Sequence, residues 1–151
     1  MKRNTIGALG PGQAEWTAVG VLEDWRDRLA DLATACAGAY ADEEHTHLLA
    51  LHALVAAAPH PVLVTGLAVP AEIRLLGLLE AGGAASAALA LIGPECGYLL
   101  SRGSNGDHLA SVVLPGASQE VSACGDTAAL ALVGALARAL AEPVIGRPAQ
   151  A

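Results

Sequence analysis

The first element that the pattern of apolar residues predicts is a helix. Between residues 22 and 36 the apolar side chains stand three, four, three and four positions apart, at Leu22, Trp25, Leu29, Leu32 and Cys36. This spacing places them on one stripe of an α-helix, with most of the charged residues off the stripe. The pattern predicts an amphipathic helix from about Gln13 to Tyr40 that packs on the chain's own core. The same stripe also fits pairing with a second copy, so its first four residues are the candidate interface of a homodimer.

Proline and glycine divide the middle of the chain into shorter elements. Asp42 is the predicted N-cap of a second helix that runs to about Ala58, where two prolines follow. The apolar run VLVTGLAV, residues 62–69, predicts a short buried strand. Pro70 is expected to begin a third helix that ends at the glycine pair starting with Gly82. The next run, ASAALALIG, fits a helix or a strand equally well, because it is short and uniformly apolar.

The last third of the chain predicts a meander of three antiparallel strands followed by a helix. Asn105-Gly106 lies between two apolar runs and indicates a hairpin, since both residues tolerate a positive φ. A second turn at Pro115-Gly116 leads into the third strand. Asp126 or Thr127 is expected to cap the final helix. This helix carries one apolar stripe to place against the sheet, formed by Leu132, Val133, Leu136 and Leu140.

These elements predict an α+β fold with an N-terminal helical layer and a three-stranded antiparallel meander packed against a C-terminal helix. We divide the chain into a flexible start at residues 1–12, a helical region with one short strand at 13–83, a sheet-and-helix unit at 84–142 and a loose tail at 143–151. The chain has 151 residues, enough to bury its own core without a metal or disulfide, so we expect one compact domain.

Charge and cysteine content narrow the class of protein. The chain has 15 acidic and 8 basic residues, a net charge of −7, and its basic residues are not clustered. Direct nucleic-acid binding needs clustered cations and is not expected, whereas an acidic surface fits a basic protein partner. The three cysteines are far apart and odd in number, which is typical of free thiols in the cytoplasm. No apolar run is long enough for a secretory signal or a membrane span, so membrane contact is not expected either.

Cys124 is the candidate nucleophile of the sequence. It ends a predicted strand just before a helix N-terminus, where a thiolate is favoured. A thiol enzyme also needs a base and an oxyanion site, and His108 is the candidate base, although nothing in the sequence pairs it with Cys124. We favour the alternative that Cys124 is a buried residue ending a packed strand, because buried cysteines are common.

Acidic residues and histidines gather in DEEHTHLLALH, residues 42–52. On a helix Glu43 and His47 are four positions apart and share a face, as helix-borne metal ligands do. His45 and His52 are about 10 Å apart along a helix axis, too far to bind one ion directly. A zinc site needs three or four ligands, so the set is incomplete without His60, His108 or a second chain. We favour an acidic helix start with exposed histidines, and expect no cofactor.

An ordered set of short motifs runs through residues 84–141. An apolar segment ends in the turn Pro94-Glu95-Cys96-Gly97, the meander follows, and the last helix opens with the phrase DTAALAL at 126–132. In this order the stretch resembles the phage ABA-sandwich domain, a small family of phage and prophage proteins. Two positions differ from the family's pattern: Ala128 replaces a usual proline, and Tyr98 and its neighbours replace a frequent tryptophan. The end of the chain is also similar to HicB-type antitoxins.

The resemblance favours a helix for ASAALALIG and implies an accessory protein of a mobile element, with no catalytic residues to carry over. The sequence therefore favours a binding protein that acts through protein–protein contact, for example against a host nucleic-acid-binding or defence complex, a role that the acidic charge suits. Two alternatives stay open. One is a metal- or thiol-dependent enzyme or sensor that uses Glu43 and His47 or Cys124, and the other is a virion structural component.

Overall fold

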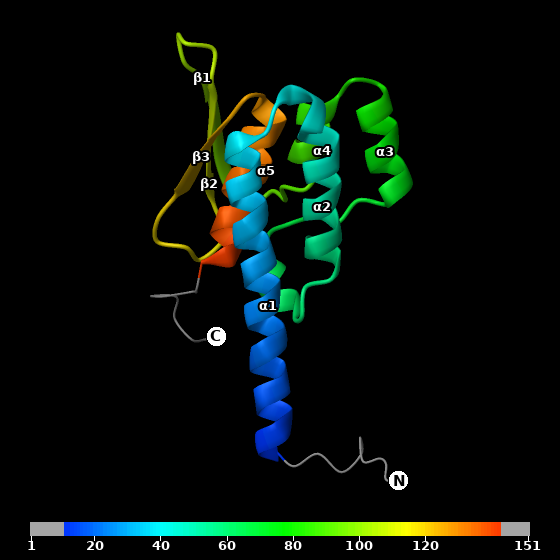
Figure 1. Cartoon of the computed structure of the whole chain (residues 1–151), viewed down its shortest axis with the longest axis vertical. Helices are drawn as coiled ribbons and strands as arrows, with labels where there is room; N and C mark the ends of the chain where they lie inside the picture. The colour runs from blue at the N-terminus through cyan, green and yellow to red at the C-terminus, as the bar shows by residue number, and fades with distance from the viewer. Residues whose placement is uncertain (1–10, 143–151) are drawn as a thin grey trace.

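Helix α5, Ala128–Ala141, is the central element of the fold. The computed structural model describes residues 11–142, and in it α5 packs against strands β2 and β3 of the sheet and against helices α1, α2 and α4 (Figure 1). Ten of its 14 residues are buried. The sequence predicted a single apolar stripe, but α5 is apolar over most of its circumference because it has neighbours on both sides. The α+β class is confirmed.

Helix α1, Pro11–Gly38, forms one wall of the helical layer. Its apolar stripe packs into the chain's own core, and the Trp25 Nε1–H donates a 2.8 Å hydrogen bond to the carbonyl of Leu54 on α2. The N-terminal part of the helix projects beyond the other helices and the sheet (Figure 1). Pro11 and Gly12, predicted to be flexible, belong to α1, while residues 1–10 and the predicted tail at 143–151 lie outside the described residues.

The connection to helix α2, Glu44–Ala56, begins with a 3-10 helix, η2, at Ala41–Glu43. Asp42 is not the N-cap of this segment, contrary to the prediction. The Glu43 carboxylate accepts a 2.8 Å hydrogen bond from the backbone N–H of Tyr40 instead. The side chain of the third residue of η2 thus accepts a hydrogen bond from the N–H of the residue just before η2, as in a capping box.

The predicted strand at residues 62–69 is wrong. Its first half is a 3-10 helix, η3, Pro61–Val64, in which His60 Nδ1 accepts a 3.1 Å hydrogen bond from the Val62 N–H. The second half makes one isolated antiparallel bridge, between Leu67 and Ile92. Proline at the first position and the His60 cap favour a helical turn, and the run has no neighbouring strand with which to form a ladder.

Helix α3, Glu72–Glu80, ends at the predicted glycines. Gly82 has a φ of +81°, and the Gly83 N–H bonds the Leu78 carbonyl at 2.8 Å, which is the pattern of a Schellman motif. The run that the sequence left open follows as helix α4, Ala84–Leu89.

The predicted meander is confirmed. Strands β1, Gly97–Arg102, β2, His108–Val113, and β3, Val121–Gly125, form one antiparallel sheet in the order β1-β2-β3. The turns between them contain Gly106 and Gly116, both with positive φ. Thr127 then caps α5, since its Oγ1 accepts a 3.1 Å hydrogen bond from the Leu130 N–H.

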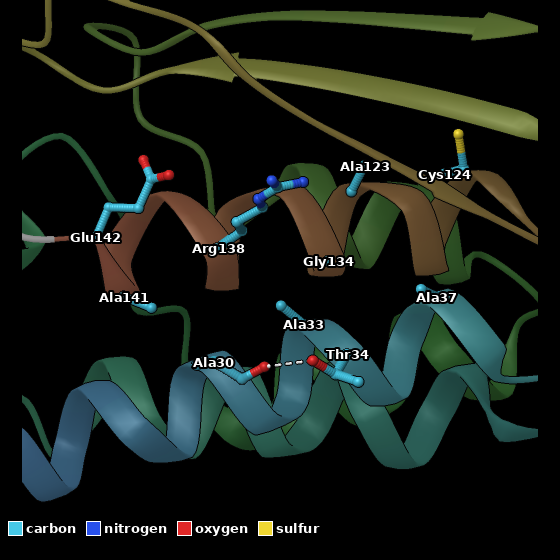
Figure 2. Close-up of a pocket in the computed structure, with 10 residues that line it drawn as sticks. All are labelled: Ala30, Ala33, Thr34, Ala37, Ala123, Cys124, Gly134, Arg138, Ala141 and Glu142. Carbon is cyan, nitrogen blue, oxygen red and sulfur yellow. Dashed lines mark hydrogen bonds between the residues drawn. The ribbon is translucent and has the colours of Figure 1, made fainter.

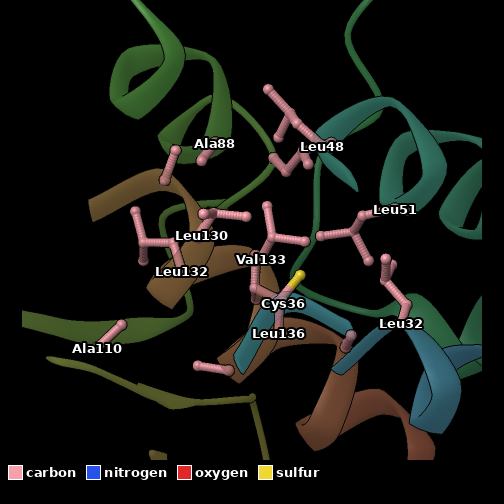
Figure 3. Close-up of a cluster of buried hydrophobic side chains, with 14 of the residues drawn as sticks. Leu32, Cys36, Leu48, Leu51, Ala88, Ala110, Leu130, Leu132, Val133 and Leu136 are labelled. Carbon is pink, nitrogen blue, oxygen red and sulfur yellow. The ribbon is translucent and has the colours of Figure 1, made fainter. Parts of the chain in front are cut away.

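One cluster of buried aliphatic side chains fills the space around α5. Figure 3 shows Leu32 and Cys36 from α1, Leu48 and Leu51 from α2 and Ala110 from β2 around the α5 side chains. The chain has no phenylalanine, and many of its buried residues are alanine. Because these side chains are small, the backbones of neighbouring elements approach closely. Within residues 11–142, none of the helices is both long enough and apolar enough to cross a bilayer.

Candidate functional site

A groove of about 600 Å³ opens between α1, α5 and the edge strand β3 (Figure 2). The α1 wall consists of Ala30, Ala33, Thr34 and Ala37. The α5 wall consists of Gly134, Arg138, Ala141 and Glu142, and β3 contributes Ala123 and Cys124. Most of these side chains are small, so the groove is bordered closely by backbone. We take it as the candidate functional site because it joins a concave surface to a sheet edge.

The register of the sheet shows that β3 has a free edge in the groove. The Gly103 N–H bonds the Asp107 carbonyl at 2.8 Å and extends the β1–β2 register, so odd-numbered residues of β1 and β2 bond each other. The even-numbered residues of β2 must then bond β3, where their partners are Ala123 and its odd-numbered neighbours. The backbone N–H and C=O groups of Ser122 and Cys124 therefore point away from the sheet.

Arg138 supports this assignment independently. Its guanidinium Nη1 donates a 3.2 Å hydrogen bond to the carbonyl oxygen of Ser122, from the side that β2 does not occupy. The register leaves the Ser122 N–H and both backbone groups of Cys124 outside the β2–β3 ladder. Unpaired edge groups of this kind are a template for pairing with another chain.

Gly134 lies under the groove, in the middle of α5. A Cβ built on it would lie 3.4 Å from the Cβ atoms of Ala123 and Cys36, an ordinary contact distance. Alanine would therefore fit here, and glycine costs a helix interior about 1 kcal/mol relative to alanine. A side chain at this position would make the groove shallower.

Cys124 is exposed, so our preferred prediction that it belongs to the core is wrong. Side chains alternate along a strand, and Ala123 faces α5, so Cys124 faces the other side of the sheet. Figure 2 shows its sulfur pointing away from α5. Cys124 is paired with Leu109, whereas the candidate base His108 is paired with Gly125. The side chains of Cys124 and His108 thus lie on opposite faces of the sheet, and no nucleophile–base pair is assembled.

The other two cysteines are buried. Burial raises the pKa of the Cys36 thiol to about 12. Burial is also the main cause that raises the pKa of Cys96, whose Sγ–H donates to the Gly66 carbonyl at 3.2 Å. Both thiols therefore stay protonated near neutral pH, and neither is a nucleophile there.

The candidate metal ligands are not brought together. Glu43 bonds the backbone of Tyr40, and His52 Nε2 lies 2.7 Å from the Pro70 carbonyl oxygen, to which it donates. His45 is exposed and His47 half-buried. Throughout residues 11–142 there is no group of three or more histidine, cysteine, aspartate or glutamate side chains placed to bind one ion.

Three residues of the candidate homodimer interface belong to the chain's own core. Trp25, Leu29 and Leu32 are 4%, 0% and 7% exposed, and Leu22 is half-buried against the same core. Nearby, Val19 and Val21 are about half exposed, at 49% and 50%. A homodimer through α1 stays a prediction, and Leu22 is the one member of the predicted set with substantial exposed surface.

Comparison of the chain with protein-family models, with curated proteins and with solved structures finds no match. The resemblance to the phage ABA-sandwich domain and to HicB-type antitoxins therefore stays a prediction.

Two features of the sequence indicate this groove, which sequence reasoning missed. One is the row of small residues on α1 at helical spacing, and the other is the glycine inside the apolar pattern of α5.

Proposed function

We propose that this protein acts by binding another protein, and that the groove between α1, α5 and β3 is the binding site. The observation that carries the proposal is the coincidence of two features at one place. Cys124, whose backbone groups face outward, lines a concave surface whose walls are mostly small side chains, and the outward-facing backbone of Ser122 lies two positions along the same edge. A binding role also agrees with the separation of Cys124 from His108, because catalysis by a thiol needs a base beside it.

The charge of the chain supports a basic partner. Net charge is −7, and Asp24, Asp27 and Asp31 are exposed on α1. Complementary charge speeds association and selects among partners more than it adds affinity. We propose a basic protein of a bacterial host, such as a subunit of a nucleic-acid-binding or defence complex, with this chain as an accessory protein of a mobile element.

Affinity capture from a bacterial host lysate tests the proposal when two matched variants are included. Ala30 and Ala35 are both exposed on α1, but Ala30 lines the groove and Ala35 does not. Ala30→Trp fills the groove with an indole, while Ala35→Trp adds the same surface elsewhere. We expect the wild-type chain and Ala35→Trp to capture the same protein and Ala30→Trp to lose it. Equal capture by both variants would refute binding at the groove.

A further inference from the structure

We infer that the partner binds through an extended segment that adds to β3 as a fourth strand of the sheet. The inference rests on the proposed function and specifies its geometry. Addition of a strand to a sheet edge is a common mode of peptide recognition, in which main-chain hydrogen bonds supply affinity and alternate side chains supply specificity.

The outer edge of β3 offers backbone groups to another chain. Ser122 and Cys124 are two positions apart on β3 and present their N–H and C=O groups on the same side, where the Ser122 C=O is bound by Arg138. Strand residues rise about 3.3 Å each, so this pair offers about 7 Å of edge. That length matches a short extended segment of three or four residues.

The helical layer extends past the edge of β3. Helix α5 is covered by β2 and β3, and α1 lies beside α5 and reaches the edge of β3. A new strand would lie about 4.8 Å beyond β3, over the small residues Ala30, Ala33 and Thr34 that line the groove. The layer of two helices is thus wider than the sheet that covers it, and the groove is the uncovered part.

Arg138 already binds this edge of β3. Its guanidinium occupies the Ser122 carbonyl that an added strand needs as an acceptor. Glu142 stands four residues later on α5 and also lines the groove, so it is within reach of the guanidinium once Arg138 releases Ser122. Arg138 therefore covers the edge while no partner is bound and turns to Glu142 when the segment enters.

Charge complementarity indicates the composition of the segment. Glu142 lies at one end of the groove. On α1, exposed Glu23 and Asp27 continue the row of small residues past the groove, at the helical spacing of three and four. We therefore expect a segment of small aliphatic side chains on the face toward the helices, with a lysine or arginine at the end near these carboxylates.

The main test removes one donor of the free edge. The Cys124 N–H is not part of the β2–β3 ladder, and proline is tolerated where a strand N–H faces outward. Cys124→Pro therefore keeps the sheet and deletes a hydrogen bond to the added strand, whereas Cys124→Ser keeps the N–H. The probe is a displayed library of random seven-residue peptides, selected on the full chain, from which one selected peptide is synthesised with a fluorophore.

We expect selected peptides to alternate small apolar residues and to carry lysine or arginine at one end. Fluorescence anisotropy should show affinity at least tenfold weaker for Cys124→Pro and unchanged for Cys124→Ser. Alternate amides of the peptide can be N-methylated in two registers, which gives two modified peptides. One of the two should also bind at least tenfold more weakly, because its methyl groups replace the hydrogens that bond β3. This result does not depend on the folding of a variant. Arg138→Met should bind several-fold more tightly, because Ser122 is then free.

Several results would overturn the inference. The first is a selection that yields no peptide. The others are equal affinity of the peptide for Cys124→Pro and Cys124→Ser, and full affinity of both N-methylated peptides. Light scattering that shows a dimer abolished by Cys124→Pro would assign the edge to a second copy. Peptide binding that requires removal of residues 143–151 would assign it to the chain itself. If lysate capture is lost with Ala30→Trp but kept with Cys124→Pro, binding at the groove stands and strand addition fails.

Discussion

The carboxylate of Asp126 accepts a 2.9 Å hydrogen bond from the backbone N–H of Ala41, 85 residues earlier in the chain. The bond ties the connection between α1 and α2 to the start of α5. Asp126 also precedes the N-cap Thr127, and a negative charge near a helix N-terminus is favourable. This hydrogen bond is one of the contacts that hold the end of α1 near the start of α5.

We expect Asp126→Ala to lower the free energy of unfolding by about 1 kcal/mol, because a charge-assisted hydrogen bond is lost at an exposed site. Asp126→Asn keeps an acceptor oxygen and should lose less. Urea denaturation of the three proteins measures both differences. Equal losses for the two variants would show that charge, and not the hydrogen bond to Ala41, is what stabilises the fold here.

Gly125 is expected to tolerate no side chain. A Cβ at this position would lie 2.6 Å from the backbone nitrogen of Ala131 on α5, which cannot move without displacing the helix. Gly125→Ala should therefore destabilise the protein by about 1–3 kcal/mol, measured by urea denaturation. Gly97→Ala is the control, since its Cβ would lie 3.8 Å from the Val113 side chain. Similar effects of the two substitutions would contradict this steric explanation.

Gly134→Ala should change stability and binding in opposite directions. The added methyl group makes ordinary contacts with Ala123 and Cys36, and alanine raises helix stability by up to about 1 kcal/mol. The same methyl group makes the groove shallower, so capture of the partner should weaken. Thermal denaturation and affinity capture of the same preparation measure the two effects. A variant that is both more stable and fully active would show that the groove depth at Gly134 has no role in binding.

Much of the fold follows from local signals in the sequence. Asn105-Gly106, Pro115-Gly116 and the Thr127 cap each specify a turn or a helix start within a few residues, and the meander was predicted from them. The strand expected at residues 62–69 was wrong because a strand requires a partner, and pairing between distant segments leaves no local signal. The central position of α5 was not predicted for a related reason. One apolar face was assigned to the sheet, and the contacts of α5 with the other helices depend on segments far away in the chain.

The candidate site was harder to predict from the sequence than the fold. The groove joins Ala30 and its neighbours to Arg138, residues about a hundred positions apart, and only the fold brings them together. The exposure of Cys124, in contrast, was available from the alternation of side chains. Once Ala123 is assigned to the face that packs on α5, its neighbour must face the other side. The preference for a buried Cys124 came from the general frequency of buried cysteine and not from this strand.

The three thiols should differ sharply in reactivity. Cys124 is exposed, and Cys36 and Cys96 are buried with raised pKa values. We expect maleimide at pH 7.5 to label one thiol of the native protein rapidly and the other two only after unfolding. Mass spectrometry of tryptic peptides identifies the labelled residue, and Cys124→Ser serves as the control. Rapid labelling that persists in Cys124→Ser would contradict the burial of Cys36 and Cys96.

The raised pKa of Cys36 should make stability depend on pH above pH 9. The thiol has an ordinary pKa of 9.0 and a pKa of about 12 in the fold, because burial disfavours the thiolate. Below pH 9 the thiol is protonated in the folded and in the unfolded chain, so its ionisation does not lower the free energy of unfolding there. Between pH 9 and 12 only the unfolded chain loses the proton, and the free energy of unfolding falls by about 1.4 kcal/mol per pH unit.

Between pH 8 and 10.5 wild type should therefore lose about 2 kcal/mol more than Cys36→Ala, in which other titrating groups are unchanged. Urea denaturation at both pH values measures the difference, and parallel losses would show that Cys36 ionises equally in the folded and unfolded chains.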